Sequence, residues 1–186
     1  MIEPIKREED AIVLDFLPNG YADDNRPSHL KTAIAQAIGK TNMALLELIP
    51  RKDIFLQPYE EVYVGDGKRD KIHHVAGKIP VSKLTITAKG ELEHVLKIII
   101  KERESEFVQF FNKSQPLSTR MHSLELLPGL GKKHMWEIVE ERRGDDFKSF
   151  ADIKARVKLI PDPEKLILKR VMKELEGDEK HKLFVH

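Results

Sequence analysis

The chain has 186 residues and a formal net charge of +1, and 34% of its residues are charged. A large share of Lys, Arg, Asp and Glu is typical here of a well-solvated globular protein and not of a disordered chain. The length corresponds to one large domain or two small ones. The absence of cysteine excludes disulfides, cysteine-ligated zinc and thiol catalysis. A net charge near zero also argues against a broad electrostatic footprint, so any binding of nucleic acid must come from local clusters.

The N-terminus and the most apolar stretch both argue against export or membrane insertion. The first ten residues are charged and lack the apolar core of a signal peptide. The most apolar run, residues 95–100, is short and is interrupted by Lys97. We therefore expect a cytoplasmic protein without a membrane partner.

Residues 1–88 show short apolar runs separated by turn residues. The apolar residues between Leu30 and Ile38 fall at helical spacing before Gly39, which predicts a helix. Asp66-Gly67 is a strong turn signal and predicts that the strands on either side of it pair as a hairpin. This mixture favours a small OB-like β-barrel with helix insertions. The expected strands are 11–17, 43–49, 54–56, 61–64, 71–75 and 84–87.

The pattern becomes helical from Lys89 onward. Residues 89–114 are expected to form one long connecting helix, broken near Ser105. Residues 115–177 are then expected to form an all-α domain, and residues 178–186 a loose tail. The predicted fold class is therefore α+β. The expected helices of the C-terminal domain are 118–127, 132–142, 152–157 and 163–175.

Residues 124–139, LELLPGLGKKHMWEIV, resemble the helix-hairpin-helix motif, in which Pro-Gly-apolar-Gly joins two helices. Gly129 and Gly131 allow a tight turn and a close approach of the backbone to a ligand. Gly131 is expected to begin the second helix, whose open N–H groups are suited to a phosphate. The alternative is a tight turn between two packed helices without a ligand.

The side chains around this turn have separate expected roles. Lys132 and Lys133 add positive charge at the start of the second helix. The Leu130 side chain is expected to pack into the core between the two helices and so to hold the loop in place. His134 lies in the first helical turn and is expected to face either the ligand or solvent. Met135 stands where the motif usually has a small residue, which predicts a wider helix pair.

Helix-hairpin-helix motifs often occur as pseudo-symmetric pairs, and residues 147–175 resemble a second copy. Its hairpin, residues 159–163, lacks both glycines, and its two prolines remove amide donors. We therefore expect a tandem domain in which only the first hairpin, Pro128–Gly131, binds phosphate. With roughly two to four phosphate contacts, the affinity should depend only weakly on salt.

Lys68 and Arg69 lie at the tip of a predicted turn in the N-terminal part. They are expected either to touch a nucleic-acid backbone or to sit in a solvated turn beside acidic neighbours. His73 and His74 are adjacent on a predicted strand and should point to opposite faces, so no shared metal is expected. No metal and no other cofactor are expected.

Three segments together resemble an archaeal family of uncharacterised proteins that is described as predicted RNA-binding. They are EEVYVG at 60–65, FVQFFN at 107–112 and HSLELLPGLG at 122–131. The resemblance implies an OB-like barrel followed by a helix-hairpin-helix domain, and it favours RNA over DNA as the partner.

The expected function is therefore binding of a phosphate backbone without catalysis. A protein-interaction module is the first alternative, because paired helices of this kind also dock proteins. A metal-dependent nuclease is the lesser alternative, suggested only by Asp23-Asp24 and Glu60-Glu61. The oligomeric state is left open.

Overall fold

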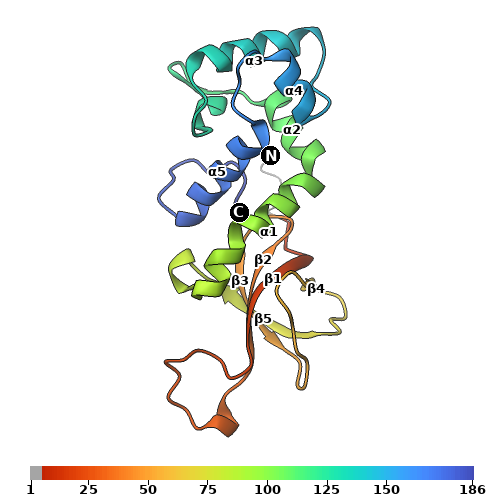
Figure 1. Cartoon of the computed structure of the whole chain (residues 1–186), viewed down its shortest axis with the longest axis vertical. Coiled ribbons are helices and arrows are strands. Elements are labelled where there is room, and N and C mark those ends of the chain that lie inside the picture. The colour runs from red at the N-terminus through yellow and green to blue at the C-terminus, as the bar shows by residue number, and fades with distance from the viewer. Residues whose placement is uncertain (1–5) are drawn as a thin grey trace. The chain divides into compact units, whose positions relative to one another are not determined.

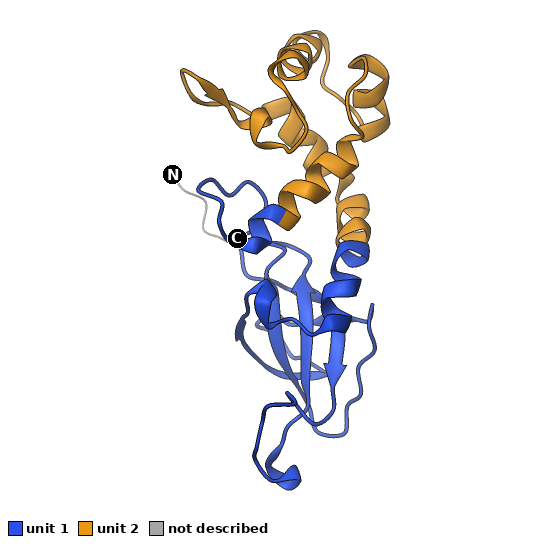
Figure 2. Ribbon diagram, turned by 60° about the vertical axis from the view of Figure 1, so that its left-hand side comes forward, with its two compact units in different colours: residues 1–95, 173–186 blue, residues 96–172 orange. Residues whose placement is uncertain are grey.

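The computed structural model describes residues 6–186 (Figure 1), and the chain divides into two compact units (Figure 2). One unit comprises residues 1–95 and 173–186, and the other comprises residues 96–172. The divisions fall inside α1 (Ile86–Glu102) and α5 (Pro163–Glu176). The sequence suggested boundaries after residues 88, 114 and 177, where the residue pattern changes.

The first unit contains a curled antiparallel sheet of five strands that forms half a barrel, in the order β4-β1-β2-β3-β5 (Figure 1). This sheet confirms the mixed α+β class. Aliphatic side chains such as Val13, Ala37 and Leu48 form a core on one face of the sheet. The strands are β1 (Asp10–Leu17), β2 (Ile34–Gly39), β3 (Leu45–Pro50), β4 (Glu61–Tyr63) and β5 (Ile72–Lys78).

The expected helix at residues 30–38 is wrong, because these residues form a short 3₁₀ turn followed by β2. All six residues of β2 are buried, so the strand lacks the polar alternation that would have identified it. Ala35 and Ala37 belong to the core on one face. On the other face, the Gln36 side chain donates to Lys83 O (3.0 Å) and accepts from Thr85 N (2.9 Å).

The expected hairpin between residues 61–64 and 71–75 is also wrong. Both strands exist, but β4 pairs with β1 and β5 pairs with β3, so they lie at opposite edges of the sheet. The turn between them is held by its own contacts, including Arg69 Nε to Gly65 O (2.6 Å) and Gly67 N to Tyr63 Oη (2.9 Å). A local turn signal cannot determine which distant strand supplies the pairing partner.

Two short expected strands are absent. Residues 54–56 form an irregular loop that buries Leu56. Residues 84–87 lead into α1, because the Thr85 hydroxyl accepts the N–H of Ala88 (3.0 Å) and caps the helix. The long helical segment after this cap is present, but it is divided at Arg103 into α1 and α2 (Glu104–Lys113).

The second unit contains α2, α3 (Lys132–Gly144), α4 (Phe150–Arg156) and most of α5. The expected helix at residues 118–127 is wrong. A small hairpin of β6 (Pro116–Ser118) and β7 (Met121–His122) occupies its first half, and a 3₁₀ helix, η3 (Ser123–Leu126), follows. Apolar residues three apart suit a 3₁₀ helix as well as an α-helix, which explains the error.

Residues 178–186 do not form a loose tail. The buried Glu174 carboxylate accepts N–H groups from three of these residues, at 2.6–2.9 Å, namely Leu183, Phe184 and Val185. The carboxyl-terminal segment also reaches the turn between β2 and β3, where His186 N donates to Asn42 O (3.1 Å). Within residues 6–186, no helix has the length and apolarity needed to cross a membrane.

Candidate functional site

The loop from Pro128 to Gly131 has the backbone that its glycines allow. Gly129 has φ +98°, a conformation that a side chain would strain, so glycine is required there. Leu130 is buried, with 6% of the residue exposed, and its N–H donates to Leu127 O (3.0 Å). Gly131, at φ −87° and ψ 175°, is the N-cap of α3. The buried leucine therefore anchors the loop while both glycines leave its outer side open.

The first turn of α3 has no side chain capping its amides and no acidic residue. Lys132 and Lys133, which follow Gly131, are both exposed. The free N–H groups of a helix start and the positive end of its dipole favour an anion. The arrangement is chemically suited to a phosphate group.

The loop before α5 has a similar backbone but is closed to anions. Leu159 has φ +58°, and the next residue, Ile160, is buried. Here the Asp162 carboxylate accepts the N–H of Glu164 (3.2 Å) at the start of α5. Asp162 thus occupies the position that an anion would need, in contrast to Gly131.

A cavity of about 530 Å³ lies beside the start of α3, within the second unit. It is bounded on one side by the β6–β7 hairpin and on the other by the first turns of α3. Trp136 is the largest side chain that lines this cavity and is 58% exposed. Met135, the residue before it, also lines the cavity and is buried. The complete lining is Pro116, Ser118, Thr119, Arg120, Met121, His122, Glu125, Lys132, Met135 and Trp136.

His122 and Glu125 cap η3 reciprocally at the edge of this cavity. Glu125 Oε2 accepts His122 N (2.7 Å), and His122 Nδ1 accepts Leu124 N (3.1 Å). Burial, and next the nearby Arg142 guanidinium, lower the pKa of His122, although Glu125 acts in the opposite direction. The imidazole is therefore neutral at pH 7, and its proton is on Nε2 because Nδ1 accepts a hydrogen bond.

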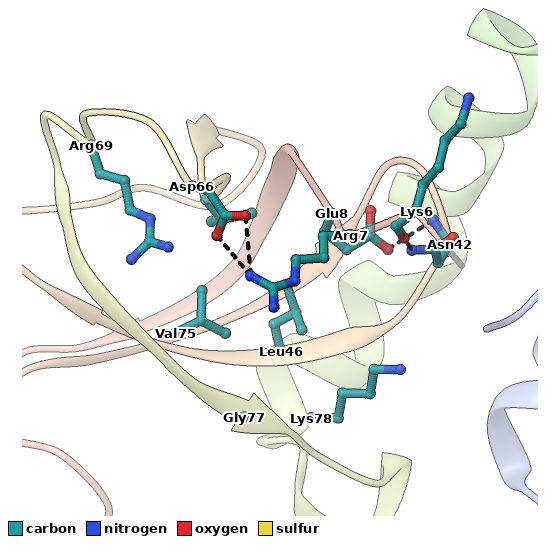
Figure 3. Close-up of a pocket in the computed structure, with 11 residues that line it drawn as sticks. Lys6, Arg7, Glu8, Asn42, Leu46, Asp66, Arg69, Val75, Gly77 and Lys78 are labelled. Atoms are coloured by element: carbon teal, nitrogen blue, oxygen red, sulfur yellow. Dashed lines mark hydrogen bonds and ion pairs between the residues drawn. The ribbon is translucent and has the colours of Figure 1, made fainter. Parts of the chain in front are cut away.

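The first unit offers a separate cavity of about 320 Å³, lined by residues of the N-terminal segment, of the loop after β4 and of β5 (Figure 3). Figure 3 shows Arg7 reaching Asp66, with two contacts of 2.9 and 3.1 Å. Arg69 lines this cavity, whereas Lys68 is exposed and does not. Since Asp66 pairs with Arg7 and Glu8 also lines the cavity, its uncompensated positive charge is smaller than the number of its Lys and Arg side chains suggests.

The structure brings Gly129, Gly131, Lys132 and Lys133 together in one loop and helix start, with His134 half-buried one residue further along α3. Lys68 and Arg69 belong to the other unit and form a separate site. Sequence reasoning missed Trp136 and Arg120. Trp136 lies off the face of α3 that buries Met135 and Ile138. This position in the helical periodicity could have predicted that Trp136 is exposed.

The expectation that His73 and His74 point apart is wrong. Their Nδ1 atoms lie 2.8 Å apart, because the register of β5 against β3 shifts at this point. Both side chains are exposed. Among residues 6–186, no group of three or more His, Asp or Glu side chains is arranged to hold a metal ion.

Residues 7–186 match the model of a family described as "Protein of unknown function (DUF655)". The uncharacterised protein MJ0038 of Methanocaldococcus jannaschii is 44% identical over 183 residues, which cover 98% of this chain and 81% of that protein. The crystal structure of Af1531 from Archaeoglobus fulgidus, described with the same family, superposes with a TM-score of 0.88 at 46% identity. That match covers 96% of this chain and 100% of the other. The chain therefore belongs to the DUF655 family, which agrees with its expected likeness to uncharacterised archaeal proteins.

Proposed function

We propose that this protein binds nucleic acid by holding a backbone phosphate at the loop Pro128–Gly131 and the first turn of α3. The observation that carries the proposal is the uncapped glycine start of α3 beside two exposed lysines. Backbone amides and lysines recognise phosphate without reading sequence. RNA is preferred over DNA in this proposal because of the archaeal family that the sequence resembles.

The same proposal includes a tandem helix-hairpin-helix architecture for the second unit. Both loops have a residue of positive φ followed by a buried apolar residue, Gly129-Leu130 in the first and Leu159-Ile160 in the second. A helix begins soon after each. The first copy differs from the motif because the 3₁₀ helix η3 stands in place of its leading α-helix. Asp162 caps the second copy, so only the first is proposed to bind phosphate.

We further propose that the half-barrel is OB-like and supplies a second surface. In OB folds, the loops between strands 1 and 2 and between strands 4 and 5 contact nucleic acid. In this protein, the loop between β4 and β5 comprises residues 64–71 and contains Lys68 and Arg69. Photo-cross-linking to RNA that contains 4-thiouridine, followed by peptide mapping, should then identify residues from both this loop and the start of α3.

The central experiment compares two double variants by fluorescence anisotropy with labelled single-stranded and duplex RNA and DNA. Lys132→Gln with Lys133→Gln removes the two charges at the start of α3. Lys154→Gln with Lys158→Gln removes two exposed charges elsewhere in the same unit and serves as the matched control. The first variant should weaken binding about 10-fold at low salt, as expected for two exposed ionic contacts.

Two results would refute the proposal. The first is that no RNA or DNA form binds at low salt. The second is an equal loss of affinity in both double variants. The lysines would then act only through the electrostatic field of the whole protein and not through a local contact with phosphate. A tight protein partner whose binding ignores salt and the lysine changes would instead favour the protein-interaction alternative.

A further inference from the structure

The cavity beside α3 has the size and the walls of a site for one planar ring system. Its volume of about 530 Å³ falls in the range of small-molecule pockets, roughly 300–1,000 Å³. Trp136 and Met121 line it and are 58% and 43% exposed. Exposed aromatic side chains of this kind stack unpaired bases in proteins that bind single strands.

Two polar side-chain atoms at the cavity have no hydrogen-bond partner within the described part of the chain. Glu125 uses Oε2 for His122 N, and its Oε1 has no hydrogen bond within residues 6–186. His122 is only 7% exposed and uses Nδ1 for Leu124 N, so its Nε2–H is an unused donor there. The cavity therefore offers one strong acceptor and one neutral donor.

Cationic groups complete the lining. The Arg120 guanidinium is exposed and has no partner among the described residues, and Lys132 belongs both to the cavity and to the first turn of α3. A phosphate at the helix start and a base in the cavity would thus share Lys132.

We propose that the cavity takes one unpaired guanine of a bound RNA, stacked on Trp136 with its hydrogen-bonding edge toward Glu125 and His122. Guanine presents the N1–H and N2–H₂ donors beside the O6 acceptor, which complements a carboxylate next to an N–H donor. Adenine and cytosine place an amino group where guanine has O6, and uracil has a single N–H donor. The inference rests on the proposed function for its phosphate partner, but it assigns a separate surface.

Trp136 is the one tryptophan of the chain, so its fluorescence reports directly on this cavity. The experiment titrates the protein with the four nucleoside 5′-monophosphates and with two labelled RNA octamers, one all uridine and one with a single central guanosine. Fluorescence anisotropy measures affinity, and Trp136 emission measures stacking. GMP should quench Trp136 most strongly, and the guanosine octamer should bind about 10-fold more tightly than the uridine octamer.

Three variants locate the effect. Trp136→Leu should remove the guanosine preference, and Trp136→Phe should keep most of it because a ring is still present. Glu125→Gln should abolish or reverse the preference between guanine and adenine. The backbone N–H of His122 requires the amide oxygen of Gln, so the amide NH₂ then faces the cavity in place of a carboxylate oxygen. Leu117→Ala, an exposed apolar residue on the same hairpin but outside the cavity, should change nothing and is the matched control.

The outcomes separate the two proposals. Octamers that bind equally well, without quenching of Trp136, would overturn the guanine site and leave the phosphate clamp standing. A guanosine octamer that quenches Trp136 and binds with unchanged affinity after Lys132→Gln with Lys133→Gln would support the guanine site and overturn the clamp. An unchanged guanosine preference in Trp136→Leu would also overturn the guanine site.

Discussion

Replacing Gly131 with aspartate should stabilise α3 and at the same time block its phosphate site. Gly131 has the extended conformation of an N-cap, φ −87° and ψ 175°, and a Cβ built there meets no atom within 4 Å. An aspartate therefore fits without strain. Its carboxylate would accept the open amides of the first turn, as Asp162 does at the start of α5.

The expected magnitudes have opposite signs. A capping carboxylate at a helix start contributes about 0.5–1 kcal/mol to the free energy of unfolding, which raises Tm by about 1–4 °C at this chain length. The substitution should also weaken binding, because the new carboxylate and a phosphate about 4 Å away repel each other. This repulsion is about 4 kcal/mol near a protein surface, before screening by salt. The affinity for nucleic acid should therefore fall by about 100-fold or more.

The assay pairs thermal unfolding with anisotropy titrations at low salt. Gly144→Asp is the matched control, because it makes the same charge change in open space at the other end of α3. It should leave affinity within about twofold. Gly131→Asp with a Tm at or above that of the unsubstituted protein, and with unchanged affinity, would show that no phosphate binds at this helix start.

Three further predictions concern salt, pH and the core. The slope of log affinity against log salt should be shallow, about −1.5 to −3.5, and a slope steeper than about −6 would indicate a much larger charged surface than proposed. Below pH 6.5 the unfolded chain takes up a proton before the folded chain does, because burial lowers the pKa of His122 in the folded state. The free energy of unfolding should therefore fall as the pH drops from about 6.5 to the lowered pKa. His122→Asn, which keeps an acceptor for Leu124 N but cannot titrate, should show a smaller fall between pH 7.5 and 5.5. An equal fall in both proteins would assign the pH dependence to other groups. Gln36→Leu should lower the free energy of unfolding in urea by about 2–4 kcal/mol, because it leaves Lys83 O and Thr85 N without partners. A loss below about 0.5 kcal/mol would mean that these two groups find other partners.

The loop at residues 128–131 shows how much of the candidate site was predictable. Pro-Gly-apolar-Gly limits the backbone within a few residues, so the positive φ of Gly129 and the helix start at Gly131 follow from local rules. Trp136 was different. Its exposure depends on which face of α3 packs against the rest of the unit, and the cavity that it lines also needs the β6–β7 hairpin.

The sequence by itself determined the α+β class, the helical character of the C-terminal half and the glycine loop, because each depends on periodicity or on dihedral preferences over short distances. Only the tertiary structure decided the partners of β4 and β5, the strand at β2 and the packing of residues 183–186. Those features depend on contacts between residues far apart in the chain. The strand β2 was predicted as a helix because both of its faces are buried, which removes the polar alternation of a half-exposed strand. Glu174 binds the carboxyl-terminal segment through backbone amides, which have no sequence signature.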